Sequence, residues 1–169
     1  QDRVEIDAYT IMQANAASMI SRGIELESVY HFAPDWLLEV NAGYLDARYD
    51  DYPDAFHGTN YDGNKVDMVP EYTITSALQY RNSFGFMGRA ELHHTGERYM
   101  DRANTKKRPA YTVLNMKLGY ETENWDVYIT AKNLTNKEYF LDGFENPMLG
   151  WMATVGAPRT ISLTFNYRF

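Results

Sequence analysis

The chain has 169 residues, a formal net charge of −7, no cysteine and 15% aromatic residues, and its mean hydropathy is −0.52. This length fits one domain, and the negative charge argues against a nucleic-acid partner, which would need a basic face. The lack of cysteine excludes disulfide scaffolds and cysteine-based metal or nucleophile chemistry. No stretch approaches the roughly 18 apolar residues of a transmembrane helix. The alternating strands of a membrane β-barrel would escape that test and are not excluded.

Alternation of apolar and polar residues predicts about eight strands along the chain. The first three cover residues 3–12, 18–32 and 36–49. A small polar connection at 13–17 separates the first two, and Pro34 sets the turn between the second and the third. No signal peptide precedes the first strand, so we expect that a leader has been removed or that an N-terminal part of a larger protein is missing.

A long polar loop at 50–69 follows the third strand, and Pro70 opens the fourth. The remaining expected strands cover residues 71–81, 84–95, 110–120, 125–133 and 159–169. Asn82 and Ser83 form the turn between the fourth and the fifth, at a hairpin spacing. Long loops at 96–109 and 134–158 separate the later strands, while the connection at 121–124 is short. Short turns and long loops therefore alternate, as in transmembrane barrels, which have short periplasmic turns and long extracellular loops.

The last strand carries the clearest alternation. Its apolar face holds Ile161, Leu163, Phe165, Tyr167 and Phe169. The residues between them are polar without exception. An edge strand of a soluble β-sandwich would look similar, but this segment ends on an aromatic residue and has no polar tail. It resembles the C-terminal strand of Gram-negative outer-membrane barrels, which the barrel assembly machinery reads, so we expect Phe165, Tyr167 and Phe169 to form a membrane-assembly signal.

Aromatic residues bracket each short turn on the apolar face. These are Phe32, Trp36, Tyr80, Phe84, Tyr120 and Trp125. Aromatic rings with a polar handle favour the boundary between lipid and water. We therefore expect an interfacial aromatic girdle on one rim, although aromatics also flank turns in other β-proteins.

The opposite face of the strands is rich in charge. It carries Glu25, Glu27, Glu39, Asn41, Thr73, Thr75, Gln79, Arg89, Glu91, His93, Asn115, Lys117, Asp126, Thr130 and Lys132. A dry core could not hold so many unpaired charges. A small closed barrel would have to pair them tightly in its lumen, whereas a wide wet lumen holds them easily. The pattern favours an arc of a large barrel.

Short motifs in a fixed order carry a family resemblance that covers essentially the whole chain. They are RGIELE at 22–27, VPEYT at 69–73, NLTNKEY at 133–139, GAPRT at 156–160 and the terminal Phe169. Together they resemble the closing portion of TonB-dependent outer-membrane receptors, most closely the ferric-siderophore receptors. The resemblance implies an all-β fold, a transmembrane antiparallel β-barrel of which this chain supplies about eight C-terminal strands out of roughly 22.

The family's barrel is occluded by an N-terminal plug that TonB pulls, and this sequence contains neither plug nor TonB box. We therefore expect a C-terminal fragment in the outer membrane of a Gram-negative cell. Its expected partners are outer-membrane lipid, the remainder of the receptor, TonB through the absent part, and the barrel assembly machinery. No covalently bound cofactor is expected; the ligand would be a ferric siderophore, although haem, cobalamin and oligosaccharide receptors share the scaffold.

Six loop residues are candidates for ligand binding. They are Arg98, Tyr99, Arg102, Tyr139, Phe140 and Trp151. The arginines would contact an anionic iron chelate through charge-assisted bonds, and the aromatic rings would stack on its rings. Alternatively, the arginines pair with Glu97 and Asp101, and the aromatics anchor the loops on the rim.

No catalytic constellation is apparent, so we expect no enzyme activity. The four histidines have no serine or cysteine partner at an interpretable spacing, and alternation places His93 and His94 on opposite faces. Acidic loop residues could bind Ca²⁺, but their spacing does not match an EF-hand, and solvated loop carboxylates are the preferred interpretation. The loop residues considered for Ca²⁺ are Asp50, Asp51, Asp54, Asp62 and Asp67, together with Asn64.

Two rival classes of protein remain at this point. The first is a self-contained eight-stranded outer-membrane barrel with a structural or adhesive role, closed by pairing of its first and last strands. The second is a soluble β-barrel that binds an apolar ligand.

Overall fold

The computed structural model describes residues 2–6, 11–15, 18–54, 58–146 and 148–169, and every regular element in them is a β-strand. No helix among these residues is long and apolar enough to span a membrane. The strands are β1 (Asp2–Ile6), β2 (Ile11–Asn15), β3 (Ser18–Ala33), β4 (Trp36–Asp51), β5 (Pro53–Asp54), β6 (Thr59–Asn60), β7 (Tyr72–Arg81), β8 (Phe86–Thr95), β9 (Arg98–Tyr99), β10 (Lys107–Arg108), β11 (Tyr111–Glu121), β12 (Trp125–Lys132), β13 (Phe140–Asn146), β14 (Gly150–Val155) and β15 (Thr160–Tyr167).

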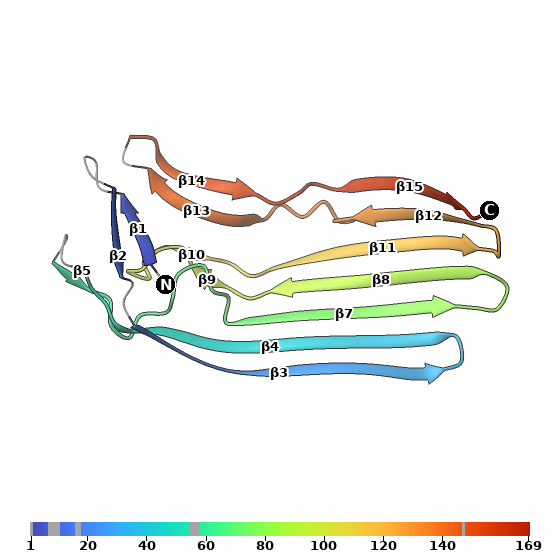
Figure 1. The fold of residues 1–169 in the computed structure, drawn as a ribbon, viewed down its shortest axis with the longest axis horizontal. Helices are drawn as coiled ribbons and strands as arrows, with labels where there is room; N and C mark the ends of the chain where they lie inside the picture. Colours follow the sequence, from blue (N-terminus) through green and yellow to red (C-terminus); the bar gives the residue numbers. More distant parts are fainter. Residues whose placement is uncertain (1, 7–10, 16–17, 55–57, 147) are drawn as a thin grey trace.

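Seven long strands form one antiparallel sheet in the order β15-β12-β11-β8-β7-β4-β3 (Figure 1). Apart from the small hairpins inserted between them, the neighbours in the sheet follow one another along the chain. The sheet is a single layer, and among the described residues no large side chain is fully buried. The apolar face of β15 is more than half exposed at each of its aromatic and aliphatic positions, which suits a surface turned to lipid rather than to a protein core.

The four short hairpins β1–β2, β5–β6, β9–β10 and β13–β14 all lie at one end of the sheet (Figure 1). The short turns between the long strands lie at the other end. The predicted division into a short-turn rim and a long-loop rim is confirmed. The loops expected at 96–109 and 134–158 are more ordered than the sequence indicated, because each contains a hairpin of its own.

The prediction of a single strand over residues 3–12 is wrong. That segment contains β1 and the first residues of β2, which pair with each other from Asp2 opposite Asn15 to Ile6 opposite Ile11. The hairpin lies at the long-loop end and is not part of the main sheet. Residues 4–6 of the alternating pattern do lie in a strand, but alternation does not report which partner a strand takes.

The free edges of the sheet are β3 and β15. They lie at opposite sides of the arc and do not pair among the described residues. This finding contradicts the rival in which the first and last strands close a small barrel.

The aromatic girdle forms at the short-turn rim. Phe32 packs on Trp36 with 5.9 Å between ring centroids, and Trp36 packs on Tyr80 at 4.9 Å. Tyr120 lies 5.7 Å from Trp125, whose ring is 6.3 Å from that of Phe165. These contacts run across strand boundaries, so the girdle also ties neighbouring strands together.

The predicted girdle position of Phe84 needs a correction. The turn after β7 covers residues 82–85 rather than 82–83, because Gly85 adopts a φ of 97° that favours glycine. Asn82 Oδ1 accepts from the amides of Phe84 and Phe86 and fixes this turn. Phe84 therefore lies in the turn itself, and Phe86 takes the strand position, 4.9 Å from the ring of Tyr120.

A second aromatic level lies near the long-loop end of the same face. Tyr44 is opposite Tyr72 in the β4–β7 register, and the ring of His94 stacks on that of Tyr72 at 5.5 Å. Trp36 and Tyr44 are eight positions apart, about 27 Å along a strand and about 20 Å in depth at the usual tilt. The distance between the two aromatic levels is thus about four fifths of the roughly 25 Å of a barrel's apolar band.

The polar face holds its charges in small networks. Arg89 forms ion pairs with Glu39 and Glu91, at 2.5 and 3.0 Å. His93 contacts Glu91 and, at 3.2 Å, the hydroxyl of Thr75. His94 points the other way and bonds Thr112 at 2.8 Å, as the alternation predicted.

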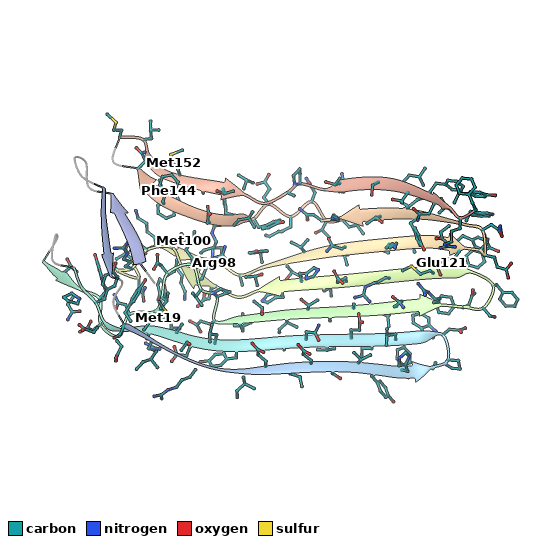
Figure 2. The ribbon with its side chains drawn as sticks, viewed as in Figure 1. Met19, Arg98, Met100, Glu121, Phe144 and Met152 are labelled. Atoms are coloured by element: carbon teal, nitrogen blue, oxygen red, sulfur yellow. The ribbon has the colours of Figure 1, made fainter. Side chains whose placement is uncertain are left out.

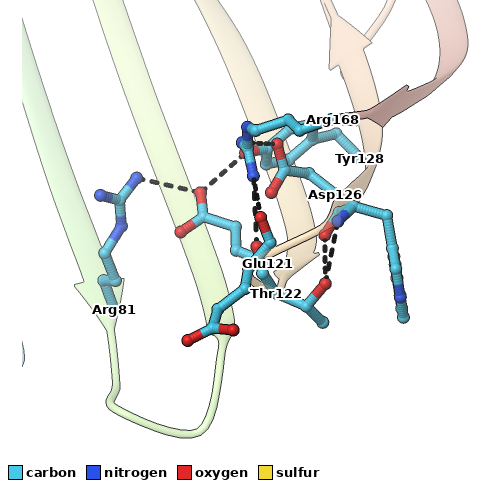
Figure 3. A network of polar contacts seen from close by, with 8 residues as sticks. Arg81, Glu121, Thr122, Asp126, Tyr128 and Arg168 are labelled. Carbon is cyan, nitrogen blue, oxygen red and sulfur yellow. Dashed lines mark hydrogen bonds and ion pairs between the residues drawn. The ribbon is translucent and has the colours of Figure 1, made fainter.

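A further network closes the short-turn rim (Figure 3). Glu121 accepts from Arg81 at 3.0 Å and from the Tyr128 hydroxyl at 2.8 Å. The buried carboxylate of Asp126 pairs with Arg168, which also donates to the carbonyl of Thr122 at 3.2 Å. Arg168 therefore fastens the end of the chain to the preceding turn.

Candidate functional site

The loops at the long-loop rim enclose a pocket of about 440 Å³ between β10, the start of β11 and the β13–β14 hairpin. We name it the rim pocket. It is lined by Met100, Lys106, Lys107, Arg108, Pro109, Ala110, Tyr111, Lys137, Glu138, Tyr139, Phe140 and Trp151. Tyr111 shares the polar face of β11 with Asn115 and Lys117, so the pocket adjoins the side of the sheet that carries the charges.

The NLTNKEY segment, residues 133–139, borders the rim pocket, which its last three residues line. Asn133 is buried and has a φ of 48°, a conformation that asparagine tolerates better than most residues. Its amide donates to the carbonyls of Lys137 at 2.9 Å and Ala157 at 3.0 Å, and its oxygen accepts from the amide of Lys137 at 2.8 Å. One side chain thereby joins the two ends of the loop, which explains the motif as a structural device.

Tyr139 forms one wall of the rim pocket. Its ring stacks on Tyr111 with centroids 4.6 Å apart and an interplanar angle of 22°. On its other side it covers Gly156, where an added Cβ would lie 2.3 Å from the ring. The ring is held in place from both sides and can offer only an edge to a ligand.

Cationic side chains hold the β13–β14 hairpin. Arg98 donates to the carbonyls of Phe140, at 3.3 Å, and Leu141. The guanidinium of Arg108 lies 4.2 Å from the centre of the Phe140 ring, and Lys106 Nζ lies 4.8 Å from that of Trp151. These cation–π contacts join the hairpin to the loop between β8 and β11.

That loop is itself tied to the loop after β4. Asn104, with a φ of 57°, accepts from the amide of Lys65 at 2.8 Å and donates to its carbonyl at 2.9 Å. Asp101 accepts from the amides of Thr105 and Lys106, at 3.1 and 2.6 Å. Three loops distant in sequence thus form one ordered rim (Figure 2).

The electrostatics of the rim are perturbed in identifiable ways. Burial lowers the pKa of Arg108, and the neighbouring charge of Arg98 lowers it further. The carboxylate of Glu97, which pairs with Lys107, raises the pKa of that ammonium. Burial opposes ionisation of Asp101, but the hydrogen bonds from Thr105 and from the Lys106 amide outweigh it and lower the pKa of Asp101.

The predicted ligand residues divide into two groups. Tyr139, Phe140 and Trp151 line the rim pocket. The other three are not among the lining residues. Their contacts explain why: Arg98 holds the hairpin, Tyr99 lies 5.7 Å from Lys107, and Arg102 lies 5.3 Å from the ring of Tyr52.

The sequence interpretation missed Lys106, Arg108, Tyr111 and Lys137 as pocket residues. The basic run at 106–108 was a visible signal. The sequence alone could not show whether this run or the arginines at 98 and 102 would line the pocket, because that depends on the pairing of β9 with β10. Of the carboxylates suggested as arginine partners, Glu97 pairs with Lys107 and Asp101 caps its own loop.

Two of the acidic loop residues, Asp62 and Asp67, accept hydrogen bonds from residues in or next to their loop. Asp62 accepts from the amide of Tyr52 at 2.6 Å and from Asn60 at 2.9 Å, and these bonds lower its pKa. Asp67 accepts from the Tyr49 hydroxyl. Within the described part of the chain no group of three or more metal-ligating side chains is assembled. His57 and the side chain of Asp54 lie outside the described residues.

Comparisons with known proteins agree on one family. The family model for the TonB-dependent receptor-like β-barrel matches residues 2–134. The pesticin receptor of Yersinia pestis is 26% identical over 160 residues, 92% of this chain and 23% of the receptor. The ferrioxamine receptor of Yersinia enterocolitica is 27% identical over 161 residues, 91% of this chain and 21% of the receptor.

Solved structures show the same architecture. The ferric yersiniabactin uptake receptor of Yersinia pestis superposes with a TM-score of 0.81 at 26% identity, over 94% of this chain and 25% of that receptor. A siderophore receptor of Acinetobacter baumannii gives a TM-score of 0.75 at 25% identity, over 98% of this chain and 24% of that receptor. The chain thus spans about a quarter of the length of these relatives, and its open sheet superposes on one part of their structures.

The expected fold class is confirmed. The family consists of transport receptors rather than enzymes, and its members lie in the outer membrane of Gram-negative cells. The family model covers most of the chain, and the open antiparallel arc with its two aromatic levels agrees with it; this chain therefore belongs to the TonB-dependent receptor-like β-barrel family.

Proposed function

We propose that this chain is the C-terminal barrel part of an outer-membrane receptor for TonB-dependent uptake of a ferric siderophore. The observation that carries the proposal is the rim pocket, which is cationic and aromatic and is built by the long loops at the outer end of the arc. Similarity to receptors named for pesticin, ferrioxamine and ferric yersiniabactin supports the same ligand class.

Two parts of the sheet would contribute to ligand uptake: the pocket at its long-loop end and its charged face. The rim pocket would hold the chelate through its cationic and aromatic side chains, among them the Arg108–Phe140 and Lys106–Trp151 pairs. The charged polar face, with Arg89 between Glu39 and Glu91, would line a wet lumen. The remaining strands and a plug would come from the rest of the receptor, and TonB would supply the energy by acting on that part.

Two further partners follow from the apolar face. Outer-membrane lipid would cover the band between the aromatic levels. The barrel assembly machinery would read the terminal strand at Phe165, Tyr167 and Phe169, whose side chains are all exposed.

Radiolabelled iron uptake tests the proposal in a strain that lacks the full-length receptor gene. Complementation with the wild-type gene should restore uptake of a cognate ferric siderophore, and deletion of TonB should abolish it. Trp151→Ala should reduce uptake, because it removes an aromatic wall of the pocket. Phe84→Ala, at the opposite rim, is the matched control. If no ferric chelate restores growth in iron-limited medium through the wild-type receptor, the proposal fails.

A further inference from the structure

Two buried guanidinium nitrogens at the outer rim lack hydrogen-bond partners among the described residues. They are Arg98 Nε and Arg108 Nη1. A buried donor without a partner costs about 1–3 kcal/mol, and more when it is charged. Each arginine therefore keeps an uncompensated, solvent-sealed donor inside an otherwise well-bonded rim.

The two arginines are also directly opposite each other in the β9–β10 register. Like charges at opposite positions destabilise an antiparallel pair. The lowered pKa of Arg108 reflects the same strain, from burial first and from Arg98 second. Arg98 offsets part of its charge by donating to the Phe140 and Leu141 carbonyls, whereas Arg108 has the face of the Phe140 ring.

The rim pocket gives an anion access to Arg108. Its lining contains Lys106, Arg108 and Lys137 against the single carboxylate of Glu138. Lys107 also lines it but is paired with Glu97, so it adds little net charge. Nη1 of Arg108 is itself sealed from solvent, so an anion in this pocket would pair with the cationic lining as a whole and offset the repulsion between Arg108 and Arg98.

The walls of the pocket select for rings as well as charge. Tyr111, Tyr139 and Trp151 contribute aromatic surface, and Lys106 lies on Trp151. An aryl group can pack edge-to-face against such walls, to which Tyr139 contributes the edge of its ring. A purely aliphatic chelate would gain less there.

We propose that the rim pocket selects an anionic iron chelate with aryl oxygen ligands, of the catecholate or phenolate type, over a neutral chelate built from hydroxamates. The proposal rests on the proposed function. Three catecholate dianions leave a ferric complex trianionic, whereas three hydroxamate monoanions leave it neutral. Only the first offers Arg108 a charge to pair with and rings to pack on the aromatic walls.

The test compares two synthetic probes on one tripodal scaffold, a ferric tris-catecholate and a ferric tris-hydroxamate. Their dissociation constants are measured on the purified full-length receptor by tryptophan fluorescence quenching. The wild type should bind the tris-catecholate at least about tenfold more tightly. Arg108→Gln should weaken that binding about 10- to 100-fold, the range expected for a lost hydrogen bond to a charged group. Binding of the tris-hydroxamate should change by less than about twofold.

Two variants frame this result. Arg108→Lys keeps the charge and loses the planar fork, so it should retain part of the preference. Arg159→Gln removes a positive charge from the same rim, outside the pocket lining, and should leave both constants unchanged. If Arg108→Gln fails to reach the outer membrane, the ratio of the two constants in Arg108→Lys decides: a ratio equal to that of the wild type overturns the proposal.

The two proposals fail in different ways. Equal wild-type affinity for both probes, or equal losses for both in Arg108→Gln, would overturn the selectivity while leaving the receptor function intact. Binding of neither probe, with no uptake of any ferric chelate, would overturn the proposed function itself.

Discussion

Single asparagines organise the outer rim. Asn104, Asn133 and Asn136 all have positive φ angles, between 48° and 57°, and each forms a side-chain hydrogen bond to a backbone group of a neighbouring segment. Asparagine suits these positions because it tolerates the left-handed region and its amide both donates and accepts. Each of these asparagines therefore has two roles: its backbone forms the local turn, and its side chain joins that turn to another segment.

Asn104→Ala tests this role at the contact with Lys65. The change removes the pair of bonds to the Lys65 backbone and puts alanine at a positive φ, so we expect a loss of about 2 kcal/mol of local stability. Hydrogen–deuterium exchange should become about 30-fold faster at the Lys65 amide. Asn124→Ala, in a short turn at the other rim, is the control. Unchanged exchange at Lys65 would show that the clamp is not stabilising.

The pKa of Asp101 predicts a pH dependence for the same loop. It is lowered from its ordinary value of 3.8 by bonds from Thr105 and the Lys106 amide, which outweigh the effect of burial. A lowered folded-state pKa means that the stabilisation is complete above the unfolded value and is lost as the pH falls through the folded one. Protection of the Lys106 amide should therefore be constant at neutral pH and fall below about pH 3.8.

Asp101→Asn separates this titration from other acid effects. The amide cannot ionise, so the acid-dependent loss of protection should disappear while protection at neutral pH is already reduced. A wild-type profile that does not change between neutral and acid pH, after correction for intrinsic exchange, would contradict the assignment.

Among whole elements, β11 and β12 are joined by an aromatic ring laid over a glycine. The ring of Tyr128 covers Gly119 directly across the ladder, and Lys117 Nζ lies 3.7 Å from its centre. The Tyr128 hydroxyl reaches Glu121 at the rim (Figure 3). The described residues place no second layer on this face of the sheet, so such contacts across strands replace a core.

Gly119→Ala should destabilise this strand pair. An added Cβ would lie 2.3 Å from Tyr128 Cδ1 and 2.9 Å from the Val127 carbonyl, so the ring must move. We expect a cost of about 1–3 kcal/mol. Gly43→Ala is the matched control, because a Cβ there meets only Thr73 Oγ1, at 3.6 Å. The temperature at which the full-length barrel loses its compact gel mobility should fall in the first variant alone, and equal shifts would contradict the argument.

The terminal strand β15 allows a second prediction about an element. Phe169→Ala should lower the amount of receptor in the outer-membrane fraction, because it removes the last aromatic of the alternating face, which packs on Tyr167 at 5.2 Å. Ligand affinity of the protein that does assemble should be unchanged. Phe84→Ala removes an aromatic from the same rim but not from the strand and should assemble normally. Normal levels for Phe169→Ala would count against the assembly signal.

At the scale of the whole molecule, the arc has two free edges. β3 and β15 each have a neighbour on one side only in the main sheet, so one row of backbone groups on each is unpaired within it. In the apolar part of a membrane every unsatisfied backbone group costs several kcal/mol, which makes an open sheet unstable there. The arc must therefore join further strands to close.

Expression of residues 1–169 alone tests this requirement. In detergent the chain should give no heat-modifiable barrel band, whereas co-expression with the remaining strands and plug should give one. Native mass spectrometry of the detergent-extracted particle should then show this chain together with the larger partner. A stable folded particle of a single 19.6 kDa chain would contradict the arc and support a small closed barrel.

The amino-acid sequence by itself determined the seven long strands of the main sheet, their two faces and the division between short turns and long loops. These features depend on period-2 alternation and on turn residues, which act within a few positions. The aromatic girdle followed from the same pattern, except where the φ of Gly85 moved Phe84 into the turn. The folds of the loops and the composition of the pocket could not be read in this way.

Only the tertiary structure decided that residues 3–12 are not a strand of the main sheet, that Arg98 holds a hairpin, and that Arg108 faces the pocket. These outcomes depend on contacts between segments far apart in the chain, such as Asn104 with Lys65 and Arg98 with Leu141. A local pattern can specify which residues are able to make such bonds. Their partners are chosen by the closure of the loops against one another, because that arrangement satisfies the backbone groups of several segments at once.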